Sequence, residues 1–73
     1  MNTSFYQYLK TLEAPIKDEK QQFIHHMIAD LAFPKQSQDY QEIAIYLEDN
    51  ALYVTNMDLF DELWQSYLEA TSF

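Results

Sequence analysis

The chain of 73 residues contains no glycine and only two prolines, so few points can interrupt a regular element. Pro15 and Pro34 mark two of these points, because the residue before a proline is pushed out of helical geometry. Between the breaks, apolar residues recur at three- and four-residue spacing, which is typical of amphipathic helices. No stretch of the sequence shows the sustained alternation of a strand. The sequence therefore predicts an all-α fold.

Four helices and one short helical turn are predicted, and together they form a compact four-helix bundle in a single domain over residues 1–73. The helices are expected at 4–13, 18–32, 38–49 and 57–71, with the short turn at 51–54. The second helix owes its length to the apolar series Phe23, Ile24, Met27, Ile28 and Leu31, which is expected to form its inner face.

Side chains that can accept a hydrogen bond from the first helical turn stand where these helices begin. For the third helix two caps are possible, and the sequence leaves the choice between them open. The candidates are Thr3 or Ser4 for the first helix, Asp18 for the second, Ser37 or Asp39 for the third, and Asn56 for the last.

The net charge of −8 is distributed unevenly along the chain. Residues 1–35 carry all four lysines and four of the twelve carboxylates, whereas residues 36–73 carry the other eight carboxylates and no cation. This balance argues against direct binding to nucleic acid or to an anionic membrane, because both need cations to neutralise phosphates. No apolar run approaches the roughly 18 residues of a membrane span, and no signal-peptide pattern is present. A cytoplasmic protein is expected.

No catalytic residue, cofactor site or metal site is predicted, so the chain is not expected to be an enzyme. His25 and His26 are adjacent and would project about 100° apart on a helix, which prevents them from sharing one metal ion easily. The chain has no cysteine, and no serine is flanked by the glycines of a nucleophile elbow. Tyr6, Tyr8 and Lys10 come nearest to a platform for stacking bases, but the two tyrosines are expected to pack instead.

The most specific expectation is a non-enzymatic protein–protein interaction module with an unidentified protein partner. Ile45 falls on the side of the third helix that carries Gln41, Glu48 and Asp49, away from the inner face, so it is predicted to be exposed. Leu68 and Phe73 are expected to remain partly exposed, whereas Trp64 should anchor the last helix against the first. Ile45, Leu68 and Phe73 are therefore candidate partner contacts.

An alternative function is an acidic mimic of nucleic acid that occupies the basic groove of a nucleic-acid-binding protein. This alternative depends on a charge array along the outer face of the last helix. The residues that would carry it are Asp58, Asp61, Glu62 and Glu69.

Several short motifs resemble one family over nearly the whole chain. They are Ser4-Phe5-Tyr6, Tyr8-Leu9, Phe33-Pro34-Lys35 with Ser37, Asp39-Tyr40, Glu42-Ile43, Tyr46-Leu47-Glu48, Phe60-Asp61 and Trp64. The pattern is similar to that of the YozE-like family of small bacterial proteins. The resemblance implies a helical domain like the sterile alpha motif, and no catalytic residues. By analogy with that fold, the lysine-bearing first half and the acidic second half could support weak self-association.

Overall fold

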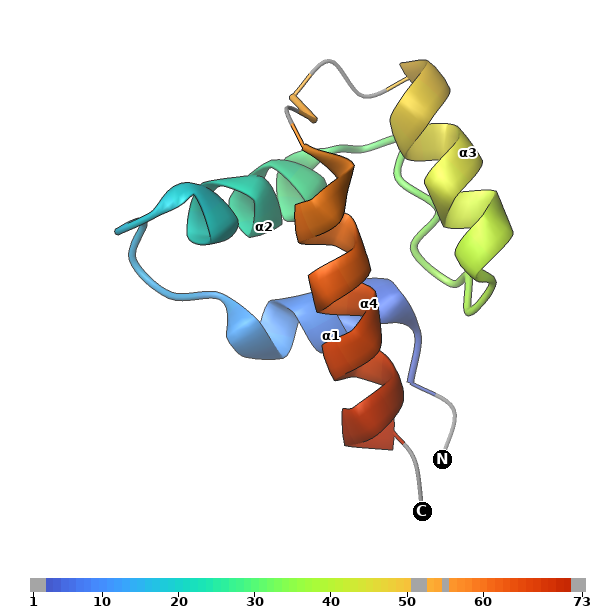
Figure 1. The fold of residues 1–73 in the computed structure, drawn as a ribbon, viewed down its shortest axis with the longest axis horizontal. Coiled ribbons are helices and arrows are strands. Elements are labelled where there is room, and N and C mark those ends of the chain that lie inside the picture. Colours follow the sequence, from blue (N-terminus) through green and yellow to red (C-terminus); the bar gives the residue numbers. More distant parts are fainter. Residues whose placement is uncertain (1–2, 51–52, 55, 72–73) are drawn as a thin grey trace.

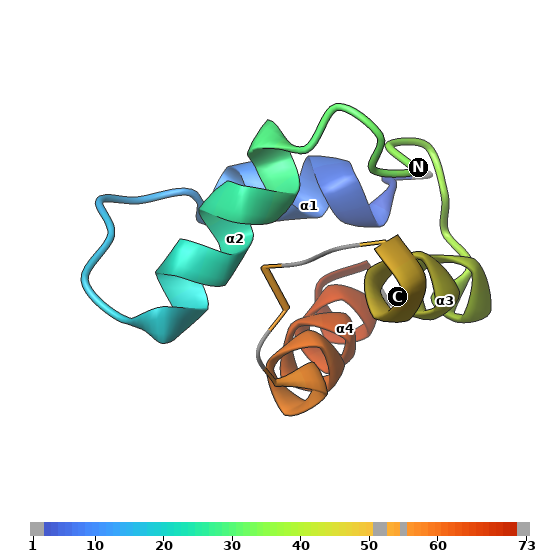
Figure 2. The same cartoon turned by 90° about the horizontal axis from the view of Figure 1, so that it is seen from above.

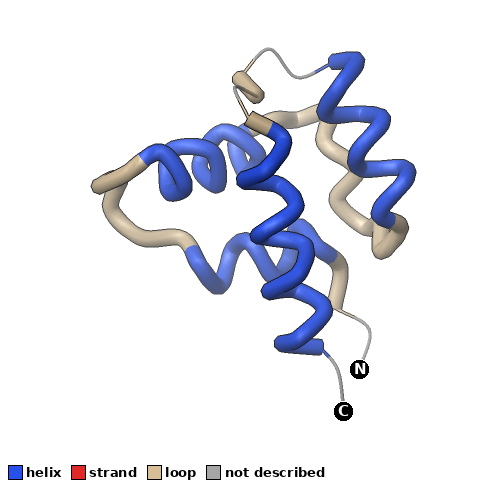
Figure 3. Tube along the Cα trace, in the orientation of Figure 1, coloured by secondary structure: helices blue, strands red, loops and turns tan. Residues whose placement is uncertain are grey.

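The computed structural model describes residues 3–50, 53–54 and 56–71. Four helices lie in these ranges: α1 (Phe5–Leu12), α2 (Glu19–Ala29), α3 (Tyr40–Asn50) and α4 (Met57–Thr71) (Figure 1). Every regular element in this part of the chain is a helix (Figure 3), so the all-α prediction is confirmed. Of the helical turn expected at 51–54, residues 51–52 lie outside the described residues, and Tyr53 lies in a turn.

The first two helices begin at predicted caps. Ser4 is the cap of α1: its Oγ accepts a hydrogen bond from the Gln7 amide at 3.2 Å, and its own amide donates to Gln7 Oε1 at 3.2 Å. This reciprocal pair is a capping box, which satisfies two backbone donors at once. Asp18 Oδ1 accepts from the Gln21 amide at 2.9 Å and caps α2. Both starts therefore follow from local sequence.

Of the two possible caps of the third helix, Ser37 and Asp39, the structure shows Asp39. Its Oδ1 accepts from the Gln41 amide at 3.0 Å, directly before α3 begins at Tyr40. Ser37 is not the cap of α3, but it binds the capping residue: its Oγ accepts a hydrogen bond from the Asp39 amide at 3.1 Å. Asn56 caps α4 as predicted, with Oδ1 accepting from the Asp58 amide at 2.9 Å.

The predicted end of the second helix is wrong by three residues. α2 ends at Ala29, and Asp30 has an extended backbone with ψ of 110°. Asp30 Oδ1 accepts from the Ala32 amide at 3.0 Å, and such a side-chain bond competes with continuation of the helix. Leu31 is consequently 91% exposed and does not belong to the inner face. The other predicted boundaries differ from the observed ones by two residues at most.

The core is one cluster that draws on all four helices and on Phe33. Phe5 of α1 is fully buried, with its ring centroid 5.1 Å from that of Trp64 and 5.5 Å from that of Tyr67. Figure 1 shows α4 running across α1. The Tyr67 hydroxyl also donates to the Thr3 carbonyl at 2.5 Å. The expectation that Trp64 anchors the last helix against the first is confirmed.

The molecule has unlike ends. Its principal extents are 32, 26 and 22 Å. In both Figure 1 and Figure 2 the connection between α1 and α2 lies at one end of the longest direction, and α3 lies at the other. These two segments therefore lie at opposite ends of the molecule.

Candidate functional site

The outer face of α3 carries an exposed aliphatic side chain among carboxylates. Ile45 is 55% exposed, as the helical phase predicts, while its neighbours Ala44 and Ile43 are buried. The residues one turn before and after Ile45 are all exposed; they are Gln41, Glu42, Glu48 and Asp49. This surface, called the α3 outer face below, can bury an apolar side chain of another molecule and attract cations around it.

The acidic residues of α4 are exposed, and one of them is bonded to α3. Asp58, Asp61 and Glu62 all lie on the surface. The Tyr40 hydroxyl donates to Asp61 Oδ1 at 2.7 Å, and the Tyr40 ring stacks on Phe60 with centroids 5.3 Å apart. The hydrogen bond to Asp61 raises the pKa of Tyr40. Asp61 thus joins two helices, a role that the sequence did not indicate.

The other two candidate contact residues fall near the end of the chain. Leu68 is 45% exposed on α4, in agreement with the expected partial exposure. Phe73 lies outside the described residues.

Asp30 forms a hydrogen-bonded hub that sequence reasoning missed. Its Oδ2 accepts from the Tyr46 hydroxyl at 2.5 Å and from the Tyr53 hydroxyl at 2.9 Å, in addition to the Ala32 amide bond on Oδ1. The carboxylate thereby fastens the end of α2 to α3 and to the segment before α4. The sequence offered one local signal for this role of Asp30, which is its position directly after the last buried turn of an apolar series.

The hub shifts the pKa of all three of its acidic groups. Burial tends to raise the pKa of Asp30, but the two tyrosine hydroxyls, the Ala32 amide and the charge of Lys35 together lower it below 3.8. The pKa of Tyr46 is raised to about 12, mainly by the hydrogen bond to Asp30 and to a smaller extent by burial. Burial, followed by the bond to the same carboxylate, raises the pKa of Tyr53.

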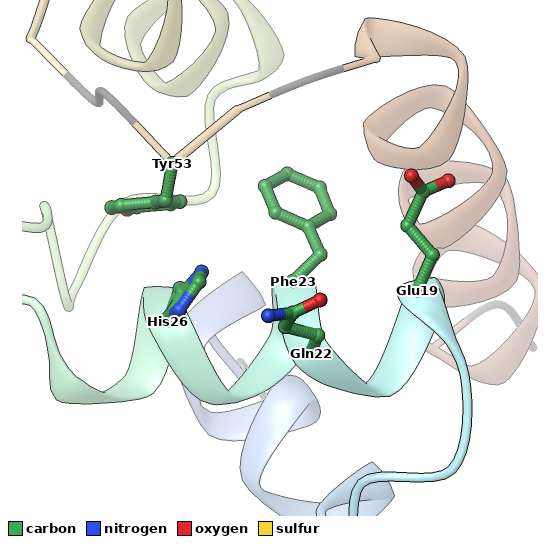
Figure 4. Close-up of a pocket in the computed structure, with 5 residues that line it drawn as sticks. All are labelled: Glu19, Gln22, Phe23, His26 and Tyr53. Atoms are coloured by element: carbon green, nitrogen blue, oxygen red, sulfur yellow. The ribbon is translucent and has the colours of Figure 1, made fainter.

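A hollow of about 220 Å³ lies beside this hub, between α2 and Tyr53 (Figure 4). α2 contributes Glu19, Gln22, Phe23 and His26 from successive turns. The His26 and Tyr53 ring centroids are 5.3 Å apart. The hollow therefore combines aromatic walls with a single carboxylate.

The two histidines face different neighbours. His25 Nε2 lies 2.5 Å from the Ala14 carbonyl oxygen, whereas His26 lies against Tyr53. This divergence is what adjacent positions on a helix dictate. Within residues 3–50, 53–54 and 56–71, no group of three His, Cys, Asp or Glu side chains is placed to hold a metal ion.

Tyr6 and Tyr8 pack against the core, as expected. The Tyr6 hydroxyl donates to the Ile28 carbonyl at 3.1 Å, and its ring lies 6.0 Å from that of Phe33. The ammonium groups of Lys10 and Lys35 lie 5.8 and 5.6 Å from the centre of the Tyr6 ring. This ring is therefore already in contact with cations and with another aromatic side chain.

None of the described helices has the length and apolar character needed to cross a membrane.

Comparison with known proteins agrees with this arrangement of helices. Residues 4–69 match the model of a family described as the YozE SAM-like fold. The chain is 54% identical over 69 residues to a UPF0346 protein of Enterococcus faecalis, and the matched residues make up 94% of this chain and 96% of that protein. It is 49% identical over 71 residues to a UPF0346 protein of Limosilactobacillus reuteri, covering 96% and 97%. The chain therefore belongs to the YozE-like family of small bacterial proteins with a helical fold like the sterile alpha motif.

Proposed function

We propose that the chain is a non-enzymatic protein–protein interaction module and that the α3 outer face contacts its partner. The observation that carries the proposal is the 55% exposure of Ile45 amid four exposed polar residues. Fully burying an isoleucine side chain contributes about 1.5–3 kcal/mol relative to full exposure, so covering the exposed 55% of Ile45 would contribute about half of that. The surrounding carboxylates favour a partner with lysine or arginine beside an apolar side chain.

The alternative, an acidic mimic of nucleic acid, would rest on charge without an apolar anchor. Its candidate array on α4 includes Asp61, whose carboxylate is already hydrogen-bonded to Tyr40. Asp58 and Glu62 remain exposed for such a role. The interaction module is therefore the better supported function, because it uses a side chain that contributes little to the core.

The hub at Asp30 gives no support to an enzymatic function. A carboxyl group acts as a general acid near neutral pH when its pKa is raised toward that pH. The pKa of Asp30 is lowered instead, and its oxygens accept three hydrogen bonds from the protein itself. These bonds make Asp30 a structural residue.

The proposal can be tested by affinity capture from the native cell with three forms of the protein: wild type, Ile45→Lys and Leu31→Lys. Leu31 is 91% exposed, so the second variant is a matched control that introduces the same lysine elsewhere on the surface. We expect the captured partner to be lost with Ile45→Lys and retained with Leu31→Lys. Equal capture by wild type and Ile45→Lys would refute the role of the α3 outer face.

A fourth form separates the two functions. In Asp58→Asn/Glu62→Gln, two exposed carboxylates of α4 are neutralised while Ile45 is unchanged. An interaction module that uses the α3 outer face should retain its partner in this variant. Loss of the partner here, together with retention in Ile45→Lys, would instead establish the mimic.

A further inference from the structure

We propose that the hollow between α2 and Tyr53 is a binding site for an arginine side chain of a partner protein. This inference goes beyond the proposed function, because the site uses α2 and Tyr53 and not the α3 outer face. It is carried by the residues that line the hollow, by their order along α2 and by the positions of the lysines. The hollow is called the aromatic hollow below.

The aromatic hollow runs along one face of α2. The lining residues of this helix follow one another at spacings of three, one and three, which places them on a single face; they are Glu19, Gln22, Phe23 and His26. Each residue adds 1.5 Å along a helix, so Glu19 and His26 stand about 10 Å apart along the axis. Figure 4 shows Phe23 between Glu19 and Tyr53. One end of the hollow therefore carries a carboxylate, and the other end carries the rings of Tyr53 and His26.

The charges in and around the aromatic hollow favour a cation. Glu19 is its one carboxylate, and no lysine is among the described residues that line it. Lys17 and Lys20 line a different hollow, between α1 and α2, and the other two lysines lie beside the Tyr6 ring. Residues 13–20 carry three carboxylates against two lysines, and the whole chain has a net charge of −8. A cation of another molecule is therefore attracted, whereas a phosphate or a carboxylate is repelled.

The walls of the aromatic hollow favour a guanidinium group over an ammonium group. A guanidinium is planar, stacks on aromatic rings, binds a carboxylate through two parallel hydrogen bonds and is more weakly hydrated than an ammonium. Glu19 supplies the carboxylate, and Gln22 carries an amide oxygen that can accept a further N–H.

The length of an arginine side chain also suits the aromatic hollow. With the guanidinium at Glu19, the methylene stem can lie over Phe23 toward Tyr53, because such stems bury themselves along apolar surface. The volume of about 220 Å³ is roughly seven times the ~30 Å³ that one water molecule occupies in the liquid, so the space can admit one such side chain.

The aromatic walls are held in place before any ligand arrives. The Tyr53 hydroxyl donates to Asp30 Oδ2 at 2.9 Å, and the Tyr53 ring centroid lies 5.3 Å from that of His26 and 6.2 Å from that of Phe23. Phe23 belongs to the core cluster. A preformed site loses less conformational freedom when it binds. The Asp30 carboxylate bonded to Tyr53 also adds negative charge at this end of the hollow.

Amide proton–nitrogen NMR spectra of the full chain, titrated with an arginine whose amino and carboxyl groups are blocked as amides, test this inference. We expect shifts concentrated at residues 19–26 and at Tyr53, with a dissociation constant on the order of a few mM, because a single side chain buries little area. The methylene protons of the bound arginine should move upfield, since they lie over aromatic rings. This second signal reports the stacking directly.

Two protein variants and two other probes serve as controls. Glu19 is exposed, so Glu19→Gln should fold normally and bind blocked arginine at least about fivefold more weakly. Glu69→Gln removes the same charge from an exposed position of α4 and should bind within about twofold of the wild type in about 0.15 M salt, where distant charges are screened. Blocked citrulline, which has the shape of arginine without its charge, and blocked lysine should each bind at least about fivefold more weakly than blocked arginine.

Several results would overturn the inference. One is the absence of shifts around the aromatic hollow at probe concentrations up to about 50 mM. Equal binding of blocked arginine by Glu19→Gln and by the wild type is another, and equal binding of blocked citrulline or blocked lysine by the wild type is a third. Ile45→Lys should still bind blocked arginine, so a failure of this inference and a failure of the proposed function are distinguishable.

Discussion

Replacement of Asp30 by asparagine probes the hub that ends α2. Asparagine keeps an oxygen for the Ala32 amide and nearly the same shape, but it removes the charge that the Tyr46 and Tyr53 hydroxyls share. A hydrogen bond to a charged group contributes about 1.5–3 kcal/mol, and one between neutral groups about 0.5–1.5 kcal/mol. Two weakened bonds therefore predict a loss of about 1–3 kcal/mol, out of the roughly 5–15 kcal/mol that stabilises a typical fold.

The size of this loss should depend on pH with a definite sign. The pKa of Asp30 in the folded protein lies below its ordinary value of 3.8, so folding favours the ionised carboxylate. The stability that Asp30 contributes is therefore fully present above the unfolded value and disappears as pH falls through the folded pKa. Urea unfolding followed by circular dichroism should show a constant gap between wild type and Asp30→Asn near neutrality. The gap should narrow below about pH 5.

Asp49→Asn is the matched control, because Asp49 is exposed on α3 and the change removes the same single charge. We expect it to alter the free energy of unfolding by no more than about 0.5 kcal/mol. The reasoning about the hub fails if Asp30→Asn is as stable as the wild type at neutral pH. It fails equally if the gap between them has the same size in acid as at neutrality.

Three further changes test the hub, a cap and the core. Tyr46→Phe should lower the free energy of unfolding by about 1 kcal/mol. Because the pKa of Tyr46 is raised to about 12, this difference from the wild type should persist below pH 10 and close as pH rises from 10 to 12 in the same urea assay. A difference that alkali leaves unchanged would contradict the prediction. Ser4→Ala removes the side-chain half of the capping box and should cost about 1 kcal/mol, seen as a lower Tm; an unchanged Tm would show that the box is dispensable. Leu63→Ala, at a fully buried position of α4, should cost about 2–5 kcal/mol, whereas Leu68→Ala on the same helix should cost less than about 1 kcal/mol; similar losses for the two would contradict the burial pattern.

The parts of the fold that the sequence predicts are those set by neighbours along the chain. The predicted range of α4 agrees with the observed Met57–Thr71, because Asn56 is a local cap and the apolar period is unbroken. The end of α2 was missed because the local bond from the Ala32 amide to Asp30 competes with an apolar period that continues to Leu31, and because the other bonds of Asp30 are remote. Asp30 is bonded to Tyr46 and Tyr53, which lie 16 and 23 residues further along the chain. Periodicity, with Pro34 as the stop, extended the predicted helix to residue 32.

The features of the candidate site likewise divide into those set by neighbours along the chain and those set by tertiary contacts. The exposure of Ile45 follows from its helical phase relative to Ile43 and Leu47, which the sequence displays directly. The bond from Tyr40 to Asp61 spans 21 residues and depends on how α3 packs on α4. Neighbouring turns of the chain cannot reveal such a contact, because it requires the tertiary arrangement.

On α3, folding and the proposed partner contact depend on opposite sides of one helix. Ile43 and Leu47 are fully or almost fully buried and belong to the core cluster, whereas Ile45, between them in sequence, is more than half exposed. An aliphatic side chain that remains in water gains little from burial, so its truncation or replacement should barely change the free energy of unfolding. Changes at Ile43 and at Ile45 should therefore separate the two properties. A change at Ile43 should lower the free energy of unfolding with or without a partner, and a change at Ile45 should matter only when a partner covers the α3 outer face.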